Sequence, residues 1–353
     1  LNMFIRAANA ISGANSMRFV PSVAPNMTSG ANKWWRLPLT TTATLLPAIT
    51  GAETTIDGRA YVYRSGVVDN KNTGNINSAV TVGVNNVTID AFERPELEIA
   101  RSLEANEATV VVQGDNITIR RLAFNTDSTQ PASYHIRHEA GSGLLVEDAI
   151  MGYDMVTNAV AATRSHYGIQ SAFNTPTAST GAYRHNYISS NLTSILLSNG
   201  EASPGNVVAT TLGDWTIEKN ILSGGIRLGA GTERLLIRYN KADDAIIMAQ
   251  SATINTAVGY NTITDNTFTS TTGDILRLFE ADNNTITLNV LQNGSGSGIS
   301  MTPGGEGNRI SQNVFGSNAS NAIDLADDGV SAATACTGAG NANCAGPTVP
   351  ASP

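Results

Sequence analysis

The chain has 353 residues, of which 41% are hydrophobic and 14% are charged, and its net charge is −8. This apolar content excludes a disordered chain and can bury a large core, either as one elongated unit or as two compact ones. The acidic surplus without a basic cluster argues against a nucleic-acid partner, and the lack of a run of about 18 apolar residues argues against direct insertion into a membrane.

The N-terminal stretch has an apolar stripe at helical spacing, formed by Phe4, Ile5, Ala8 and Ile11. This pattern predicts an amphipathic helix. Such a helix can cover the first unit of a stacked structure, whose unpaired strand edge would otherwise pair with other chains. We therefore predict that residues 1–50 form a cap helix together with the first strands.

A repeated isoleucine or valine follows the cap, at intervals of roughly 20 to 40 residues. The positions are Ile89, Ile119, Val146, Ile188, Ile217, Ile237, Ile263, Ile286 and Ile310. A unit of this size with only short strands cannot bury its own inward face, so it must stack on copies of itself. Turns rich in Asn, Gly, Asp and Ser separate the strands without an intervening helical pattern. The sequence thus predicts an all-β fold, a parallel β-helix with coils over residues 51–330 and irregular insertions around 123–183.

The third residue after each later repeat position is an asparagine. These are Asn191, Asn220, Asn240, Asn266, Asn289 and Asn313. Asparagine tolerates the left-handed backbone angles of turns, and its amide offers two donors and an acceptor, so that stacked asparagines can form a hydrogen-bonded ladder. We interpret the column as structural. The alternative is glycosylation, since Asn26, Asn86, Asn116 and Asn191 begin formal acceptor sequons.

The opening residues also resemble a known group of proteins. The segments FIRAANAISGANSMRFVP, WRLPL, LLPAIT and TTIDG are similar to the start of large bacterial surface-exposed proteins with a right-handed parallel β-helix. These proteins are related in layout to polymorphic outer-membrane and autotransporter-type passengers. The most specific elements are Ala8-Asn9-Ala10 and Ile56-Asp57-Gly58. The resemblance implies a right-handed β-helix and secretion or surface display, and it transfers no catalytic motif.

Ionisable residues gather in the irregular middle of the chain, where all four histidines lie. If the protein is an enzyme, the candidate catalytic residues are His138, Glu139, Asp148, Asp154, Arg164 and His166. Acid and base groups of this kind can process polysaccharides, although long insertions in any solenoid accumulate polar residues. His135 and His138 are the one histidine pair near ligand spacing, and on a strand they would face opposite sides. We therefore expect no metal and no cofactor.

The C-terminal segment, residues 331–353, holds both cysteines and three prolines. Cys336 and Cys344 lie in Gly/Asn/Ala-rich sequence without further metal ligands, which favours a local disulfide in an oxidising compartment. Pro347, Pro350 and Pro353 indicate an extended linker. Because this covering of the last strand is thin, head-to-tail self-association is a further expectation.

These features favour a secreted or cell-surface rod without catalytic activity, acting as an adhesin, a spacer or a fibre or filament subunit. Its expected partner is a glycan or another surface component. The alternative is a polysaccharide-binding or polysaccharide-cleaving β-helix enzyme, a lyase or a glycoside hydrolase, with its site in the insertions at 123–185.

Overall fold

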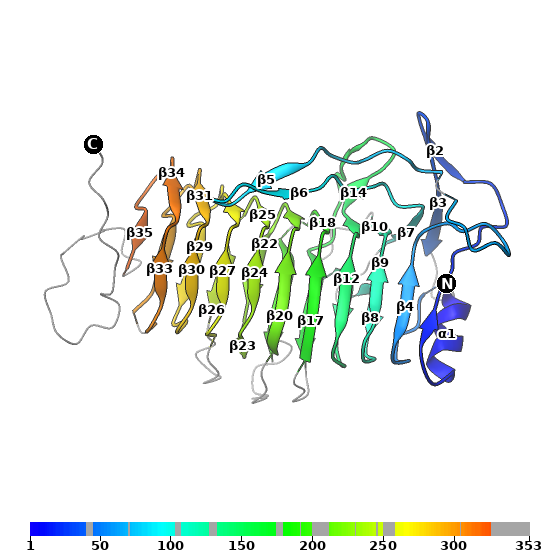
Figure 1. Ribbon diagram of the computed structural model, residues 1–353, viewed down its shortest axis with the longest axis horizontal. Coiled ribbons are helices and arrows are strands. Elements are labelled where there is room, and N and C mark those ends of the chain that lie inside the picture. The colour runs from blue at the N-terminus through cyan, green and yellow to red at the C-terminus, as the bar shows by residue number, and fades with distance from the viewer. Residues whose placement is uncertain are drawn as a thin grey trace, which may run out of the picture.

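The computed structural model describes residues 1–39, 45–69, 71–102, 107–126, 133–173, 179–190, 192–199, 212–229, 231–244, 246–249, 258–303 and 305–325. These residues form a right-handed parallel β-helix, which confirms the predicted fold. Figure 1 shows the strands stacked along the long axis, with the N-terminal helix at one end. From the coil that begins at β4 (Thr54–Asp57) onward, each coil contributes a short strand to each of three long sheets.

The first sheet begins each coil. Its strands are β1 (Asn15–Ser16), β4 (Thr54–Asp57), β9 (Thr118–Arg120), β12 (Leu144–Glu147), β17 (Ser179–Arg184), β20 (Leu212–Glu218), β24 (Leu236–Arg238), β27 (Thr262–Thr264), β30 (Thr285–Thr287) and β33 (Arg309–Ser311), with β23 (Thr232–Glu233) also paired to β20.

The second sheet follows the first around a tight corner. Its strands are β2 (Met27–Ser29), β3 (Asn32–Leu39), β7 (Leu97–Arg101), β10 (Leu122–Asn125), β13 (Ile150–Met151), β18 (Tyr187–Ile188), β21 (Ile221–Leu222), β25 (Lys241–Ala242), β28 (Thr267–Phe268), β31 (Val290–Gln292) and β34 (Val314–Gly316). Only β2 and β3 pair antiparallel within it.

The third sheet completes the coil. Its strands are β8 (Ala108–Val112), β11 (Tyr134–His138), β16 (Tyr167–Phe173), β19 (Thr193–Asn199), β22 (Gly225–Leu228), β26 (Ile246–Ala249), β29 (Leu276–Phe279), β32 (Ile299–Met301) and β35 (Ile323–Asp324).

Inward-facing side chains stack in columns from coil to coil. In the first sheet Ile237, Ile263 and Ile286 pair in register and are fully buried. Burial of such a column removes apolar surface from water, at roughly 25 cal/mol per Å². Two predicted repeat positions lie elsewhere. Tyr183 takes the place expected for Ile188, which belongs to the second sheet, and Ile89 lies in an antiparallel hairpin. The segments around Ile188 and Ile89 show the same two-residue alternation as a first-sheet strand, so periodicity alone cannot distinguish them from one.

The corner between the first and second sheets has a constant geometry. The residue before each ladder asparagine has a positive φ, for example 57° at Lys219, 59° at Tyr239 and 53° at Asp265. The left-handed backbone angle therefore falls one position before the asparagine. The expectation that asparagine is used here because it tolerates that angle is wrong. The asparagine instead uses its side chain to satisfy backbone groups that the tight turn leaves unpaired.

Six buried or half-buried asparagines form this ladder. They are Asn186, Asn220, Asn240, Asn266, Asn289 and Asn313, and each Oδ1 beyond the first accepts from the backbone N–H and Nδ2 of the asparagine one coil earlier. The sequence pattern assigned this ladder position to Asn191, which lies outside the described residues. In the structure Asn186 occupies the position. A second, shorter ladder joins Asn261, Asn284 and Asn308 at the preceding corner.

A long excursion leaves the helix between β4 and β7. We call residues 60–69 and 71–96 the arm. It contains the antiparallel hairpin β5 (Val80–Val82) and β6 (Val87–Ile89), which lies across the ends of several coils in Figure 1. Beneath it, outside the second sheet, is a separate apolar cluster that includes Trp34, Ile89 and Phe92. The smaller hairpin of β14 (Tyr153–Asp154) and β15 (Ala159–Val160) contributes Tyr153 to the same cluster.

The tip of the arm is attached far along the stack. Asn85 Nδ2 donates to Asp265 Oδ1 at 2.8 Å, the Gly83 N–H donates to Thr267 Oγ1 at 3.0 Å, and the Val84 N–H donates to the Leu288 carbonyl at 3.0 Å. The arm therefore spans from β4 to the β27 and β30 coils. All of it lies outside the 123–183 range in which irregular insertions were predicted.

The N-terminal end is closed by α1 (Asn2–Ala10), as expected. Ile5 and Ala8 are buried against the first coil, while Ile11 is 59% exposed because it lies past the end of the helix. Asn9 Oδ1 accepts from the N–H groups of Thr50 and Gly51. Residues 331–353, with Cys336 and Cys344, lie outside the described residues. In the described part of the chain, no helix combines the length and apolar character needed to cross a membrane.

Candidate functional site

The strands of the first sheet end in a column of charges with alternating sign. In register order these residues are Asp57, Arg120, Glu147, Arg184, Glu218 and Arg238. Arg120 forms ion pairs with Asp57 at 3.0 Å and with Glu147 at 3.6 Å, and Glu218 forms them with Arg184 at 3.1 Å and with Arg238 at 2.8 Å. Parallel pairing brings equivalent positions of successive coils side by side. Charges of equal sign would repel each other there, whereas alternating charges attract.

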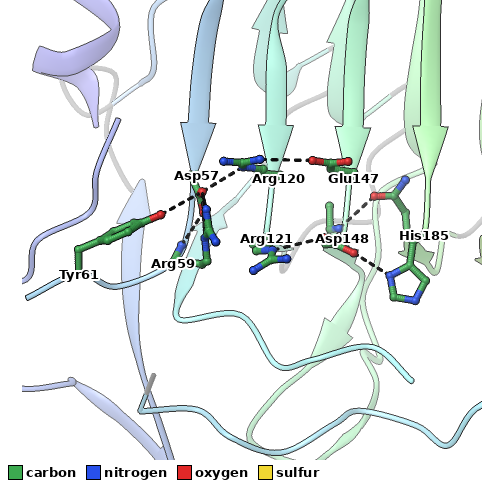
Figure 2. A network of polar contacts seen from close by, with 10 residues as sticks. Asp57, Arg59, Tyr61, Arg120, Arg121, Glu147, Asp148 and His185 are labelled. Carbon is green, nitrogen blue, oxygen red and sulfur yellow. Dashed lines mark hydrogen bonds and ion pairs between the residues drawn. The ribbon is translucent and has the colours of Figure 1, made fainter. Parts of the chain in front are cut away.

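Asp57 is the most buried member of the column, with a side chain that is 2% exposed. Arg59 Nη2 lies 2.5 Å from Asp57 Oδ2, Arg120 Nε lies 3.0 Å from it, and the Tyr61 hydroxyl donates to it at 3.4 Å (Figure 2). Burial alone would raise the pKa of Asp57, but the hydrogen bonds from Arg59 and the charges of Arg59 and Arg120 outweigh it and lower the pKa. Asp57 is therefore ionised at neutral pH.

A second cluster lies at the corner positions of the next coils. Asp148 Oδ1 lies 2.7 Å from His185 Nδ1, and Asp148 Oδ2 lies 3.3 Å from Arg121 Nε (Figure 2). All three residues have positive φ, from 49° to 54°, which points their side chains out of the corner. Burial opposes the charge on Asp148, but the hydrogen bond from His185 and the charges of His185 and Arg121 lower its pKa.

His185 also contacts the arm. Its Nε2 lies 3.2 Å from the Asp90 carbonyl oxygen, and its ring stacks on Phe92 with centroids 4.3 Å apart and planes 11° from parallel. Burial would lower the pKa of His185, but the hydrogen bonds to Asp148 and to the Asp90 carbonyl outweigh that effect and raise the pKa.

A cavity of about 200 Å³ lies between these coil residues and the arm. Its coil side is formed by Arg59, Arg121, Asp148 and His185, and its arm side by residues 90–96. The cavity thus combines guanidinium donors, carboxylate acceptors and the apolar surface of Phe92. We take it as the candidate functional site.

Of the predicted catalytic candidates, Asp148 alone lines this cavity. His138 is buried inside the helix, where Nδ1 lies 3.1 Å from Ser171 Oγ, and burial lowers its pKa to about 4. Glu139 pairs with Arg137 at 2.5 Å on the outside of β11.

The remaining candidates are also dispersed. Asp154 accepts from the Val156 N–H and from Thr157 Oγ1, which stabilises the turn of the β14–β15 hairpin. Arg164 donates to Ser189 Oγ at 2.9 Å, and His166 packs edge-on against Tyr167. The structure does not bring the six candidates into one site.

Sequence reasoning missed most of the residues that the structure does bring together. In the sequence Asp57 is notable only as part of Ile56-Asp57-Gly58, and no pattern indicates a functional role for Arg59, Arg121 or the arm residues 90–96. The sequence does contain a signal for the charge column. When the first-sheet strands are aligned on their isoleucines, the charge of the last strand residue alternates in sign from one coil to the next. The contact of His185 with Asp90 has no such signal, because it depends on where the arm lies.

His135 is a buried histidine outside the candidate site. It is 0% exposed, neither ring nitrogen has a hydrogen-bond partner among the described residues, and burial lowers its pKa to about 3. Within the described ranges, no three His, Cys, Asp or Glu side chains form a group that could hold a metal ion.

Three comparisons place these observations among known proteins. A family model described as "Periplasmic copper-binding protein (NosD)" matches residues 111–331. Among solved structures, the A-module of the mannuronan C-5 epimerase AlgE4 from Azotobacter vinelandii is 10% identical with a TM-score of 0.51, covering 92% of each chain. The AlgE6 A-module from the same organism is 11% identical with a TM-score of 0.49, covering 92% of this chain and 90% of that one.

An exopolygalacturonase from Thermotoga maritima is 8% identical with a TM-score of 0.26, covering 80% of this chain and 84% of that one. No curated protein matches the chain. At these identities the structural likeness shows the fold alone, which is the parallel β-helix that the opening residues implied. None of the comparisons bears on a relation to autotransporter passengers.

Proposed function

The chain belongs to the family described as periplasmic copper-binding protein (NosD), and from this premise we propose that it acts outside the cytoplasm as a carbohydrate-binding β-helix. In this proposal the cavity beneath the arm holds one sugar residue of a polysaccharide. The observation that carries the proposal is the cavity itself, about 200 Å³ in volume and walled by both donors and acceptors.

The chemistry of the walls suits a sugar. A pyranose presents hydroxyl groups that both donate and accept, so its site needs acceptors and donors in close alternation. Asp90, Glu93 and Asp148 supply carboxylates, and Arg59 and Arg121 supply guanidinium groups. The volume is below that of pockets for drug-sized ligands, which fits a single ring better than a longer segment.

The geometry supports binding better than turnover. A general base must offer a lone pair to the proton that it removes. Asp148 has one oxygen on His185 and the other on Arg121, and both nitrogens of His185 face acceptors. Asp57 is held by two arginines. A lyase or a hydrolase needs a base that is free to take up a proton, whereas a binding site can use these groups in the paired geometry that they already have.

The rod interpretation has less support than this alternative. Neither the family description nor the similar structures point to an adhesin, a spacer or a filament subunit. The periplasm named in the family description agrees with the expected location outside the cytoplasm.

Copper, which the family description also names, does not fit the described residues. Imidazole and thiolate side chains are preferred copper ligands. In the described ranges no three His, Cys, Asp or Glu side chains form a group that could hold a metal ion, and the cavity contains one histidine whose two nitrogens already have partners. We therefore assign no step to copper.

The test is a binding screen with purified protein against acidic and neutral polysaccharides, by calorimetry and by a glycan array, with parallel assays for unsaturated products and reducing ends. We expect binding without turnover, and at least a tenfold loss in Arg121→Gln, since hydrogen bonds to charged groups contribute about 1.5 to 3 kcal/mol. Arg234→Gln is the matched control, because Arg234 forms an exposed ion pair with Asp214 away from the cavity. Equal binding by both variants, or no binding by the wild type, would overturn the proposal.

A further inference from the structure

The contacts of His185 require a doubly protonated ring. The Asp90 carbonyl oxygen can only accept a hydrogen bond, so Nε2, 3.2 Å away, must carry a proton. Asp148 is ionised and can also only accept, so Nδ1, 2.7 Å from Oδ1, must carry the second proton. A neutral imidazole has one N–H and can make only one of these bonds. The observed arrangement is therefore that of an imidazolium.

The two hydrogen bonds join two different parts of the molecule. Asp148 and His185 lie at successive coil corners, whereas Asp90 and Phe92 belong to the arm. The His185 ring lies between them, stacked on Phe92 and with its edge in the cavity wall. Its protonation state thus bears on how firmly residues 90–93 are held against the coils.

From this geometry we infer that His185, together with Asp148 and the Asp90–Phe92 segment, forms a pH-dependent latch that holds the arm closed over the cavity. For its effect on ligand entry the inference rests on the proposed carbohydrate-binding function. The latch itself concerns only the arm and the coils, and it can be measured without a ligand.

The carboxylates around His185 favour the protonated ring and therefore the closed form. From the coils, Asp148 stabilises the imidazolium, and Arg121 and Arg59 are the cations that interact with the same carboxylate. From the arm, Asp90 stabilises it, and Glu93 also lines the cavity. Lys219 is the cation at the equivalent corner of the next coil.

The direction of the switch follows from the raised pKa of His185. Such a group contributes stability that is complete below the ordinary histidine pKa of about 6.5 and is lost as the pH rises through the higher folded value. Above the folded pKa the neutral ring has only one N–H. Either Asp148 or the Asp90 carbonyl oxygen then faces the lone pair of an unprotonated ring nitrogen. The arm segment then loosens, so the cavity is closed below the folded pKa of His185 and accessible above it.

Other contacts confine the movement to a short segment. The arm tip is held by Asp265 and Thr267, and the Arg94 N–H donates to the Gly74 carbonyl at 2.9 Å. Glu96 Oε1 accepts from the N–H groups of Lys71 and Asn72, both at 2.7 Å. Burial raises the pKa of Glu96, but a carboxyl group with a raised pKa gains charge as the pH rises, so these acceptor contacts are kept when His185 loses its proton. Phe92 is also hydrogen-bonded to the facing part of the arm, since its carbonyl accepts from the Ile76 N–H at 3.0 Å and its N–H donates to Asn77 Oδ1 at 2.9 Å. We therefore expect residues 75–77 to move with residues 90–93 while the arm tip and residues 94–96 stay in place.

The ligand-free test uses nitrogen-15 NMR of the histidine rings and hydrogen exchange of the arm in the full chain. We expect both His185 nitrogens to be protonated at pH 6, and the protection factors of residues 90–93, corrected for intrinsic rates, to fall about tenfold between pH 6 and pH 9. Asp148→Asn should shift this transition to lower pH, whereas His166→Gln, a histidine that does not line the cavity, should leave it in place. A single protonated nitrogen at pH 6, or protection that does not change with pH in the wild type, would disprove the latch.

The second test adds the polysaccharide found in the binding screen. We expect its association rate to rise with pH in the wild type and to lose that dependence in Asp148→Asn. If the ring titrates and the arm loosens but no polysaccharide binds at any pH, the proposed function fails and the latch stands. If binding occurs and the NMR titration shows a neutral ring throughout, the latch fails and the proposed function stands.

Discussion

Asn240 Oδ1 accepts two hydrogen bonds from Asn220 one coil earlier, from the backbone N–H and from Nδ2, each at 3.0 Å. One side-chain oxygen thus satisfies a corner amide and links adjacent coils. Repetition of this unit along the corner explains why a buried polar residue is used there in preference to an apolar one.

We predict that Asn266→Ala destabilises the protein by about 1 to 3 kcal/mol, because the substitution leaves the buried Asn240 N–H without its acceptor. Chemical denaturation followed by circular dichroism measures the loss. Gln292→Ala, on the partly exposed face of β31, is the control. An unchanged midpoint for Asn266→Ala would show that the ladder is not structural, above all if a binding activity disappeared at the same time.

Asp57→Asn should remove an acid-dependent part of the stability. The pKa of Asp57 is lowered in the folded protein, so its ionised form contributes stability above the unfolded value of about 4, and this contribution is lost as the pH falls through the folded pKa. We expect the wild type to lose stability in that range and the variant to start lower at pH 7 and change less. Unfolding curves between about pH 2 and 7 check this. Parallel curves for the two proteins would contradict it.

The two interior histidines should make the helix sensitive to mild acid. Burial lowers the pKa of His135 to about 3 and that of His138 to about 4. The unfolded chain takes up these protons first, so stability is complete above about pH 6.5 and falls as the pH drops toward the folded values, by up to about 1.4 kcal/mol per pH unit for each histidine. His135→Leu should reduce this slope between about pH 6.5 and 4, whereas His166→Gln should not; an equal slope in the wild type and His135→Leu would count against the prediction.

Gly83→Ala should release the tip of the arm. Gly83 has φ 71°, and an added Cβ would lie 2.6 Å from the backbone of Asp265. The clash cannot be relieved by a side chain, so the hairpin must move away from β27. We expect limited proteolysis to cut near residues 80–89 in the variant and not in the wild type, with the melting temperature of the coils little changed. Ser65→Ala, on an exposed part of the arm, is a suitable control. Resistance of Gly83→Ala to cleavage would mean that the tip is held by other contacts.

The repeat of the coils could be predicted from the sequence because stacked coils require the same residue type at the same position. Every coil must place an apolar side chain at the same inward position, and Ile237, Ile263 and Ile286 do so in register. The regular asparagines follow from the same requirement, since each corner leaves the same backbone groups unpaired. The N-terminal helix was equally legible from Ile5 and Ala8, which are buried on one side of it.

Only the tertiary structure decided where the irregular segments lie. Asn186 and Asn191 are both plausible ladder residues by spacing, and pairing of Tyr183 with Val146 and Ile217 selects the first. The arm leaves the helix after Asp57 and returns its residues 90–96 to His185, although nothing in the local sequence of either segment specifies the other. Periodicity reports interactions that recur in every coil, whereas the candidate site depends on contacts made once, between segments far apart in the chain, and these arise only when the whole stack is formed.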